Sequence, residues 1–368
     1  MPDSANEKLY NYTVRHGIDL ARFENYHIGQ VQAWLQDDLM PRVKAQLERF
    51  NKAGFDYRTK AQQSILDRIN DVVGGSMGTM SKGLYGEMKT LAKEEGKAIT
   101  EAVKRLTPVD IGFELPNLRT LSSIVMDRPF EGRILKEYFD ELAPNAQTLI
   151  QNTIKDGMFR GLSIPDMVTQ LEGSDIFTGT ISQIRNEAAK YVRTAVQHVS
   201  SHARQATYQE NEDIIKGYQV VGTLDTRICE ICVPKDGEVI TDIEDFSLMP
   251  PFHFNCRCST VPVLKSWNEL GIDLNEAPEG TRASMSGQVS DKLTATEWLK
   301  KQPISVQQDV LGKTKGNLFN QGQITAKSLT KNNQVLNLRQ VIKRNRLSLD
   351  EIEEYAPKQV LTVLKGTA

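Results

Sequence analysis

Leucine and valine recur every four positions in the N-terminal part of the chain. Leu35, Leu39, Val43 and Leu47 follow one another at this spacing, with charged and polar residues between them. Side chains at this spacing lie on one face of an α-helix, whose period is about 3.6 residues. The pattern predicts an amphipathic helix here, and residues 1–107 have a mostly helical pattern throughout.

A glycine-rich run interrupts the helical pattern between residues 74 and 86. A phosphate-binding loop needs G-x-x-x-x-G-K-[ST] between a strand and a helix. Here Lys82 precedes Gly83 and no strand pattern leads in, which argues against a nucleotide site. Because glycine is a poor helix former, the run predicts a flexible break between two helices.

Helical patterns continue as far as residue 209. Proline lacks a backbone N–H and clashes with the preceding turn, so we expect Pro144 to be one of the positions that separate these helices. Ser163 followed by Pro165 is typical of a helix start. The strongest helix is predicted over residues 181–209, whose apolar stripe consists of Ile184, Ala188, Tyr191, Ala195, Val199 and Ala206.

The pattern changes at Gly217 to short β-branched runs bounded by turns. Residues 217–229, 238–241 and 258–264 contain candidate strands of this kind. Residues 275–292 are rich in glycine, serine and charge, which predicts a linker or arm. Short helices are predicted after it.

Composition describes an ordinary soluble protein. Hydrophobic residues make up 39% and charged residues 25% of the 368 residues, which is enough apolar mass for a core. The formal net charge of −2 gives no global basic field, so the chain is not expected to coat nucleic acid non-specifically. No apolar run is long enough to span a bilayer and the first residues lack the apolar core of a signal peptide, so we expect a reducing, cytosol-like compartment.

All four cysteines lie within thirty residues of one another, together with one of the five histidines. A structural zinc takes four thiolate or imidazole ligands, usually from two closely spaced pairs. Such a site can contribute roughly 10 kcal/mol or more to folding, which a region with few large apolar residues needs. The candidate ligands of one structural zinc per chain are Cys229, Cys232, His253, Cys256 and Cys258.

Five donors exceed the four positions of a closed zinc site. The first three together with Cys256 are the favoured set, because H-x2-C suits a turn, with Cys258 next. If residues 256–258 are extended, the side chains of Cys256 and Cys258 point to opposite sides. Which of the two is the fourth ligand stays open.

Three other interpretations of the cluster remain. The thiols are free and buried as small hydrophobic groups, or they form disulfides, which a reducing compartment disfavours, or they hold a catalytic metal. The last would make the protein a metal-dependent nuclease of HNH type, with His253 as general base and Asn255 as a further polar group. A separate pair, His198 and His202, is spaced to lie on one helical face, but no third ligand is evident and a solvated or hydrogen-bonded face is favoured.

The chain as a whole is predicted to have an α+β fold that is predominantly α-helical. It consists of a helical N-terminal body, a small zinc-knuckle β module and an extended, partly helical C-terminal tail. The expected domains are an N-terminal helical region over 1–107, a helical body over 108–216, the β module over 217–265 and a linker with a C-terminal tail over 266–368.

The segments around the cysteines resemble the phage head-morphogenesis family, the minor head proteins similar to the F protein of phage Mu. That family has a pattern of the type LDxRtCpxC…DG followed by PPxHxxCRCxxxP. The positions that match are Leu224, Asp225, Arg227, Cys229, Cys232, Asp236, Gly237, Pro250, Pro251, His253, Cys256, Arg257, Cys258 and Pro262.

The resemblance implies a structural role rather than an enzymatic one. Members are low-copy head components that associate with the portal and assist head assembly, DNA packaging or genome ejection. The implied partners are the portal protein, the major capsid protein and packaged DNA, with no membrane and no small-molecule substrate. The implied location is the virion, in the capsid interior or at the portal vertex, after synthesis in the bacterial host cytoplasm.

Overall fold

The computed structural model of the chain describes residues 5–49, 60–275 and 281–365. Most of these residues are helical, and the strands form three small antiparallel sheets. The expected fold class, α+β and predominantly α-helical, is therefore confirmed. The chain forms two compact units: unit 1 comprises Met1–Gly17, Glu95–Pro116 and Ser201–Ala368, and unit 2 comprises Ile18–Glu94 and Asn117–Ser200.

The first helices follow the predicted leucine and valine pattern. Helix α1 (Ala5–Ala33) continues through a π-helical turn, η1 (Trp34–Leu39), into α2 (Met40–Leu47). The wider turn precedes Pro41, which has no N–H to donate. The indole of Trp34 donates to the Ser76 hydroxyl (2.7 Å), which in turn donates to Asp38 (2.6 Å). The four residues of the predicted apolar face are all fully buried in unit 2.

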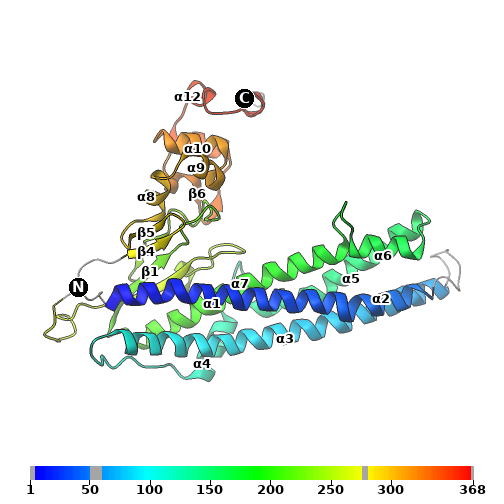
Figure 1. The fold of residues 1–368 in the computed structure, drawn as a ribbon, viewed down its shortest axis with the longest axis horizontal. Helices are drawn as coiled ribbons and strands as arrows, with labels where there is room; N and C mark the ends of the chain where they lie inside the picture. The colour runs from blue at the N-terminus through cyan, green and yellow to red at the C-terminus, as the bar shows by residue number, and fades with distance from the viewer. Residues whose placement is uncertain (1–4, 50–59, 276–280, 366–368) are drawn as a thin grey trace. The chain divides into compact units, whose positions relative to one another are not determined.

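Helix α3 (Lys60–Leu106) runs unbroken through the glycine run, so the predicted break is wrong (Figure 1). Gly74 leaves room for the Gln147 side chain of α5, because a Cβ there would lie 2.4 Å from its Nε2. Gln147 donates to the carbonyl of Asn70 (2.9 Å) and so ties α5 to α3. Buried neighbours such as Val73 and Met77 anchor the helix on either side of the glycines, and this packing outweighs their low helix propensity.

Unit 2 is completed by α4 (Leu118–Asp127), α5 (Leu135–Phe159), α6 (Ile164–Glu172) and part of α7 (Thr180–Glu210). Pro144 lies inside α5 and does not separate two helices, which corrects the prediction. Burial of the α5 face that includes Phe139 and Ile150 offsets the roughly 3 kcal/mol that an internal proline costs. Ser163 caps α6 as predicted, in a reciprocal pair with Asp166.

The three-stranded sheet of unit 1 has the order β2-β1-β3 and is antiparallel. Its strands are β1 (Ile215–Val221), β2 (Val239–Ile240) and β3 (Ser259–Leu264), close to the predicted positions. Tyr218 of β1 pairs with Ile240 on one side and Pro262 on the other. Gly217 allows the close approach of β2, since a Cβ at this position would lie 2.3 Å from the Ile240 carbonyl oxygen.

The described part of the predicted linker is structured. Strands β4 (Thr281–Ser284) and β5 (Gly287–Ser290) form an antiparallel hairpin, and the side chain of Arg282 within it is buried. A polar composition suggested a loose arm here. Arg282 instead forms an ion pair with a buried carboxylate from another part of the chain. The local sequence does not reveal this contact.

The predicted short helices follow the hairpin. They are α8 (Ala295–Lys300), α9 (Ile304–Leu311), α10 (Lys313–Asn320), α11 (Leu338–Asn345), α12 (Leu349–Glu353) and α13 (Lys358–Lys365), with a small β6 (Thr330–Lys331) and β7 (Gln334–Val335) pair between α10 and α11. Trp298, Leu318 and Val341 from this region belong to the same hydrophobic core cluster as Cys256 and Tyr218. The four domains expected from sequence, with their three boundaries, stay predictions.

Candidate metal centre

Two turn regions of unit 1 and the segment before β3 bring the five predicted donors together. Cys229 and Cys232 lie in the turns that follow β1, where the amide of Cys232 donates to the Cys229 carbonyl (3.0 Å). His253 belongs to a second turn, which closes at Asn255 in the left-handed conformation (φ 58°). Cys256 and Cys258 follow in a segment that is not a strand, since β3 starts at Ser259. The expectation that their side chains point apart therefore does not apply.

Three distances between donor atoms are close to those of a tetrahedral zinc site. The Nε2 of His253 lies 3.0 Å from Sγ of Cys229 and 3.2 Å from Sγ of Cys232, and the sulfurs of Cys232 and Cys256 are 3.8 Å apart. Zinc bonds of about 2.3 Å to sulfur and 2.0–2.1 Å to nitrogen place two tetrahedral sulfurs about 3.8 Å apart and a sulfur and nitrogen about 3.5 Å apart. These three distances differ from the tetrahedral values by no more than about half an ångström.

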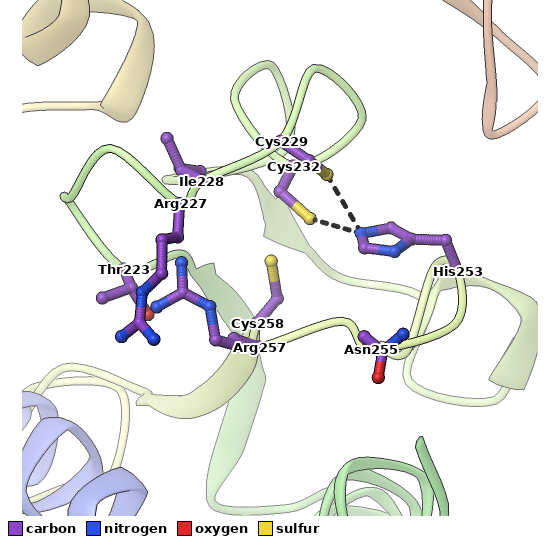
Figure 2. Close-up of a pocket in the computed structure, with 9 residues that line it drawn as sticks. All are labelled: Thr223, Arg227, Ile228, Cys229, Cys232, His253, Asn255, Arg257 and Cys258. Atoms are coloured by element: carbon purple, nitrogen blue, oxygen red, sulfur yellow. Dashed lines mark hydrogen bonds between the residues drawn. The ribbon is translucent and has the colours of Figure 1, made fainter. Parts of the chain in front are cut away.

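The five donors form two groups that share Cys232. One group is Cys229, Cys232 and His253, and the other is Cys232, Cys256 and Cys258; within each group the ligand atoms lie within 4.8 Å of one another. Figure 2 shows the sulfurs of Cys229 and Cys232 facing the imidazole, and the sulfur of Cys258 directed toward Cys232. The structure therefore brings all five predicted residues to one place.

The electrostatics of the cluster favour the ionised form of two thiols. Hydrogen bonding to Cys232 and the nearby His253 lower the pKa of Cys229 to about 5. Burial alone raises the pKa of Cys256, but hydrogen bonds from Cys232, Cys258 and His253 lower it well below its usual range. Burial lowers the pKa of His253, but the hydrogen bonds and charges of Cys229 and Cys256 raise it to about 11. Thiolate is the form of cysteine that binds metals.

A small cavity lies against the donors. Its volume is about 30 Å³ and its walls include Cys229, Cys232, His253 and Cys258. Sites for organic ligands have volumes of roughly 300–1,000 Å³. The cavity therefore suits an ion or a water molecule and not an organic substrate.

An ion pair joins the two halves of the cysteine motif. Arg257 donates to both carboxylate oxygens of Asp225, at 2.8 and 2.7 Å. These contacts lower the pKa of Asp225 despite its partial burial, which acts in the opposite direction. Because Arg257 stands between Cys256 and Cys258, the pair holds their segment against the turn that carries Cys229 and Cys232. This gives a structural role to two of the residues in the predicted motif.

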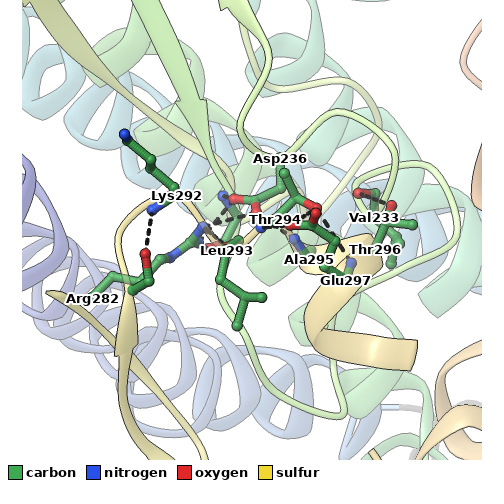
Figure 3. A network of polar contacts seen from close by, with 11 residues as sticks. Val233, Asp236, Arg282, Lys292, Leu293, Thr294, Ala295, Thr296 and Glu297 are labelled. Carbon is green, nitrogen blue, oxygen red and sulfur yellow. Dashed lines mark hydrogen bonds and ion pairs between the residues drawn. The ribbon is translucent and has the colours of Figure 1, made fainter. Parts of the chain in front are cut away.

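A second, fully buried ion pair supports the cysteine turn from the side of the hairpin (Figure 3). Asp236 accepts two hydrogen bonds from Arg282, both 2.9 Å long, and one each from the amides of Gly222 and Ala295, both 2.6 Å long. Both side chains are at most 2% exposed. Sequence reasoning identified Asp236 within the motif but missed Arg282, because the arginine lies in the supposed linker. The local sequence gave no signal for this pairing, because the cation next to Asp236 in the chain is Lys235.

A further contact comes from the C-terminal helices. Lys315 of α10 donates to Glu230, which stands between the two cysteines of the first pair, at 2.6 Å. The hydroxyl of Thr296 on α8 donates to the Val233 carbonyl (3.3 Å). The C-terminal region thus surrounds the cysteine turn with polar contacts that the motif alone did not predict.

The structure also bears on the disulfide interpretation of the cluster and on the separate histidine pair. All four cysteines are free, so the disulfide alternative receives no support. His198 and His202 do not join a group of metal-binding side chains among the described residues. His198 is fully buried near the ring of Phe130 in unit 2, and His202 lies near the ring of Phe246 in unit 1.

Comparisons with known proteins gave one match. No described helix has the length and apolar character of a membrane span. No match was found among curated proteins or solved structures. Residues 148–261, which run from α5 to β3 and include all five candidate ligands, match the model of a protein family. Over this segment the resemblance noted from the sequence is confirmed, since residues 148–261 match the family described as Phage Mu protein F like protein.

Proposed function

We propose that this chain is a minor head protein of a phage, a structural component of the virion that associates with the portal. Its partners in this proposal are the portal protein, the major capsid protein and packaged DNA, and its work is to assist head assembly, DNA packaging or genome ejection. It is made in the cytoplasm of the bacterial host. The observation that carries the proposal is the family match over residues 148–261, which spans the helix α7 and the whole cysteine cluster.

The proposed role of the cysteine cluster is to hold one structural zinc. Cys256 and Cys258 are at most 2% exposed, Cys232 is 4% exposed, and Cys229 and His253 are half-buried, so protein would enclose most of the ion's surroundings. Structural zinc sites are closed in this way, whereas catalytic ones keep a position open for water or substrate. When bound, the zinc would contribute folding free energy to a sheet whose strands are only two to seven residues long.

A nuclease is the alternative that uses the same residues, and one observation favours it: Asn255 lines the cavity beside His253. Against it, the Asn255 side chain points away from the imidazole (Figure 2). Nε2 of His253 faces two sulfurs and Nδ1 lies 2.7 Å from the Phe254 carbonyl oxygen. Neither ring nitrogen is free to take a proton from water, and no carboxylate lines the described walls of the cavity.

The test combines location, metal content and activity. We expect mass spectrometry of purified heads to detect the chain, elemental analysis of the purified protein to find one zinc per chain, and the zinc-loaded protein to leave duplex DNA uncut. Absence from purified heads would overturn the head function. A folded, metal-free protein would overturn the zinc role, and DNA cleavage that is lost in His253→Ala would establish the nuclease instead.

A further inference from the structure

A groove with an excess of positive charge lies between α3 and α4 in unit 2. Its volume is about 230 Å³, and its lining includes Lys89 and Lys93 from α3 and Arg119 from α4. Lys89 and Lys93 are four residues apart and so project from the same helical face. Asn117 caps α4 by accepting from the Arg119 amide (3.0 Å), which fixes the backbone of the arginine at the groove.

The three cations have no carboxylate partner among the residues that the structure describes. Of the other surface cations in unit 2, Lys44 pairs with Glu172, Arg133 with Glu141 and Lys136 with Asp140, whereas Lys155 donates to the side-chain carbonyl of Gln151. The one recorded contact of the Lys89 ammonium is with the ring of Tyr85, whose centroid is 4.8 Å away. Unpaired cations that converge on one groove leave it available to an anion.

The rest of the lining fits phosphate groups. Ser122 and Ser123 line the groove, and the Ser122 hydroxyl donates to the Lys89 carbonyl (3.3 Å). Among the described lining residues Asp127 is the single acidic side chain, which leaves an excess of two positive charges. The Ser123 hydroxyl lies 3.5 Å from the Asp127 carboxylate. Lysine, arginine and serine are the side chains that most often contact phosphate oxygens in nucleic-acid complexes.

Spacing favours a polymer over a single anion. Residues four apart on a helix have Cβ atoms about 5–6 Å apart, so Lys89 and Lys93 reach two neighbouring phosphates more readily than one. We propose that the α3–α4 groove binds the phosphodiester backbone of duplex DNA without reading its sequence. The choice of DNA as the polymer rests on the proposed head function. The excess positive charge of the groove is an observation that does not depend on that function.

The experiment measures the salt dependence of DNA binding by the full chain. Fluorescence anisotropy with a short labelled duplex of random sequence compares the wild type with a triple variant, Lys89→Gln, Lys93→Gln and Arg119→Gln. The matched control removes three exposed charges outside the groove, through Lys155→Gln, Lys300→Gln and Lys343→Gln. All six side chains are exposed, so both variants should fold, and thermal melts followed by circular dichroism verify this.

Each phosphate contact adds about 0.9 to the slope of log affinity against log salt. Loss of three contacts should therefore lower the slope by about 2.7, so that between roughly 50 and 200 mM salt the wild type loses about 40-fold more affinity than the groove variant. The control should keep the wild-type slope. Equal changes in the two variants, or no DNA binding by the folded wild type at low salt, would overturn the proposal.

Two further measurements distinguish DNA binding by the groove from binding of an acidic protein segment and from the proposed head function. The wild type is also tested with polyglutamate in place of DNA. If the groove variant loses polyglutamate binding but keeps DNA binding, the ligand of the groove is an acidic protein segment. The location test is independent of the groove. A chain found in purified heads that fails to bind DNA removes the groove proposal alone, whereas groove-dependent DNA binding by a chain absent from heads removes the head function alone.

Discussion

Cys232 is the residue on which the candidate metal centre depends most. It belongs to both groups of donor atoms, and its sulfur is close to both His253 and Cys256. The neighbouring residues contribute in other ways: Arg257 aligns the second cysteine segment, and Asn255 supplies the left-handed turn before it. At the residue scale the sequence identified the five candidate donors. Which four of them would bind the metal depends on the distances between the donor atoms.

Substitution of single cysteines should separate the fourth ligand from the bystander. We expect Cys232→Ser and Cys256→Ser to lose zinc and the cooperative unfolding of the β module, because each removes a thiolate from a site that contributes roughly 10 kcal/mol. Cys258→Ser should keep one zinc per chain. Cys256 is preferred since it also raises the pKa of His253. Elemental analysis and thermal melts check this, and retention of zinc in Cys256→Ser with loss in Cys258→Ser would reverse the assignment.

His198 should make unit 2 sensitive to acid. Burial lowers its pKa to about 4, against about 6.5 in an unfolded chain. Between these values the unfolded state binds the additional proton, so stability is complete above pH 6.5 and falls as the pH drops toward 4, by about 3 kcal/mol in total. Urea unfolding across this pH range measures the slope. His198→Gln should flatten it, whereas an unchanged slope in that variant would show that other groups cause the acid sensitivity.

The long helix α3 illustrates how packing at the element scale overrides local propensity. Its glycines have different surroundings: a Cβ at Gly74 would meet Gln147, whereas a Cβ at Gly75 would have no neighbouring atom within 4 Å. The first glycine is explained by the approach of α5. The second has no steric explanation in the structure of this chain.

These two neighbouring glycines provide a matched pair of variants. Gly75→Ala should raise the free energy of unfolding of unit 2 by about 0.5–1 kcal/mol, because alanine loses less backbone entropy in a helix. Gly74→Ala should give no such gain, since the new methyl displaces Gln147 from its hydrogen bond to Asn70. Urea unfolding of both variants checks the difference. An equal gain from both substitutions would contradict the packing role of Gly74.

The hairpin of β4 and β5 is a second element whose place depends on one buried contact. Arg282→Met should destabilise unit 1 by about 3–5 kcal/mol, because it leaves Asp236 charged and buried without its cation. Lys300→Met, at an exposed position on α8, is the control and should change stability by less than about 0.5 kcal/mol. Chemical unfolding of both proteins tests this, and a loss of similar size in the control would show that the ion pair is not the cause.

At the scale of the whole molecule, the chain combines two units with different sources of stability. Unit 2 is a helical assembly held by apolar side chains such as Leu35, Ile150 and Val196, all fully buried. Unit 1 includes a small sheet, the cysteine cluster and buried ion pairs. The helices α1, α3 and α7 contribute residues to both units.

Metal removal should therefore affect the two units unequally. A strong chelator at neutral pH is expected to lower the stability of the segment from 222 to 264, which contains the cluster, while the amides of α5 keep their protection from hydrogen exchange. The reason is that zinc stabilises only the structure that supplies its ligands. Hydrogen exchange with mass spectrometry resolves the two regions. Unchanged exchange in the cysteine segment after chelation would contradict a structural metal.

The sequence by itself determined the helical character, the position of the strands β1, β2 and β3, and the five donors of the cysteine cluster. These features depend on local spacing: period 3.6 for helices, short β-branched runs for strands, and pairs of metal ligands close in the chain. The tertiary structure decided that α3 and α5 continue through Gly74 and Pro144, that Arg282 meets Asp236, and that Lys89, Lys93 and Arg119 line one groove. Each of these features depends on contacts between residues far apart in the sequence. At such contacts burial outweighs local helix propensity, and no periodic pattern in the sequence indicates which residue is the partner.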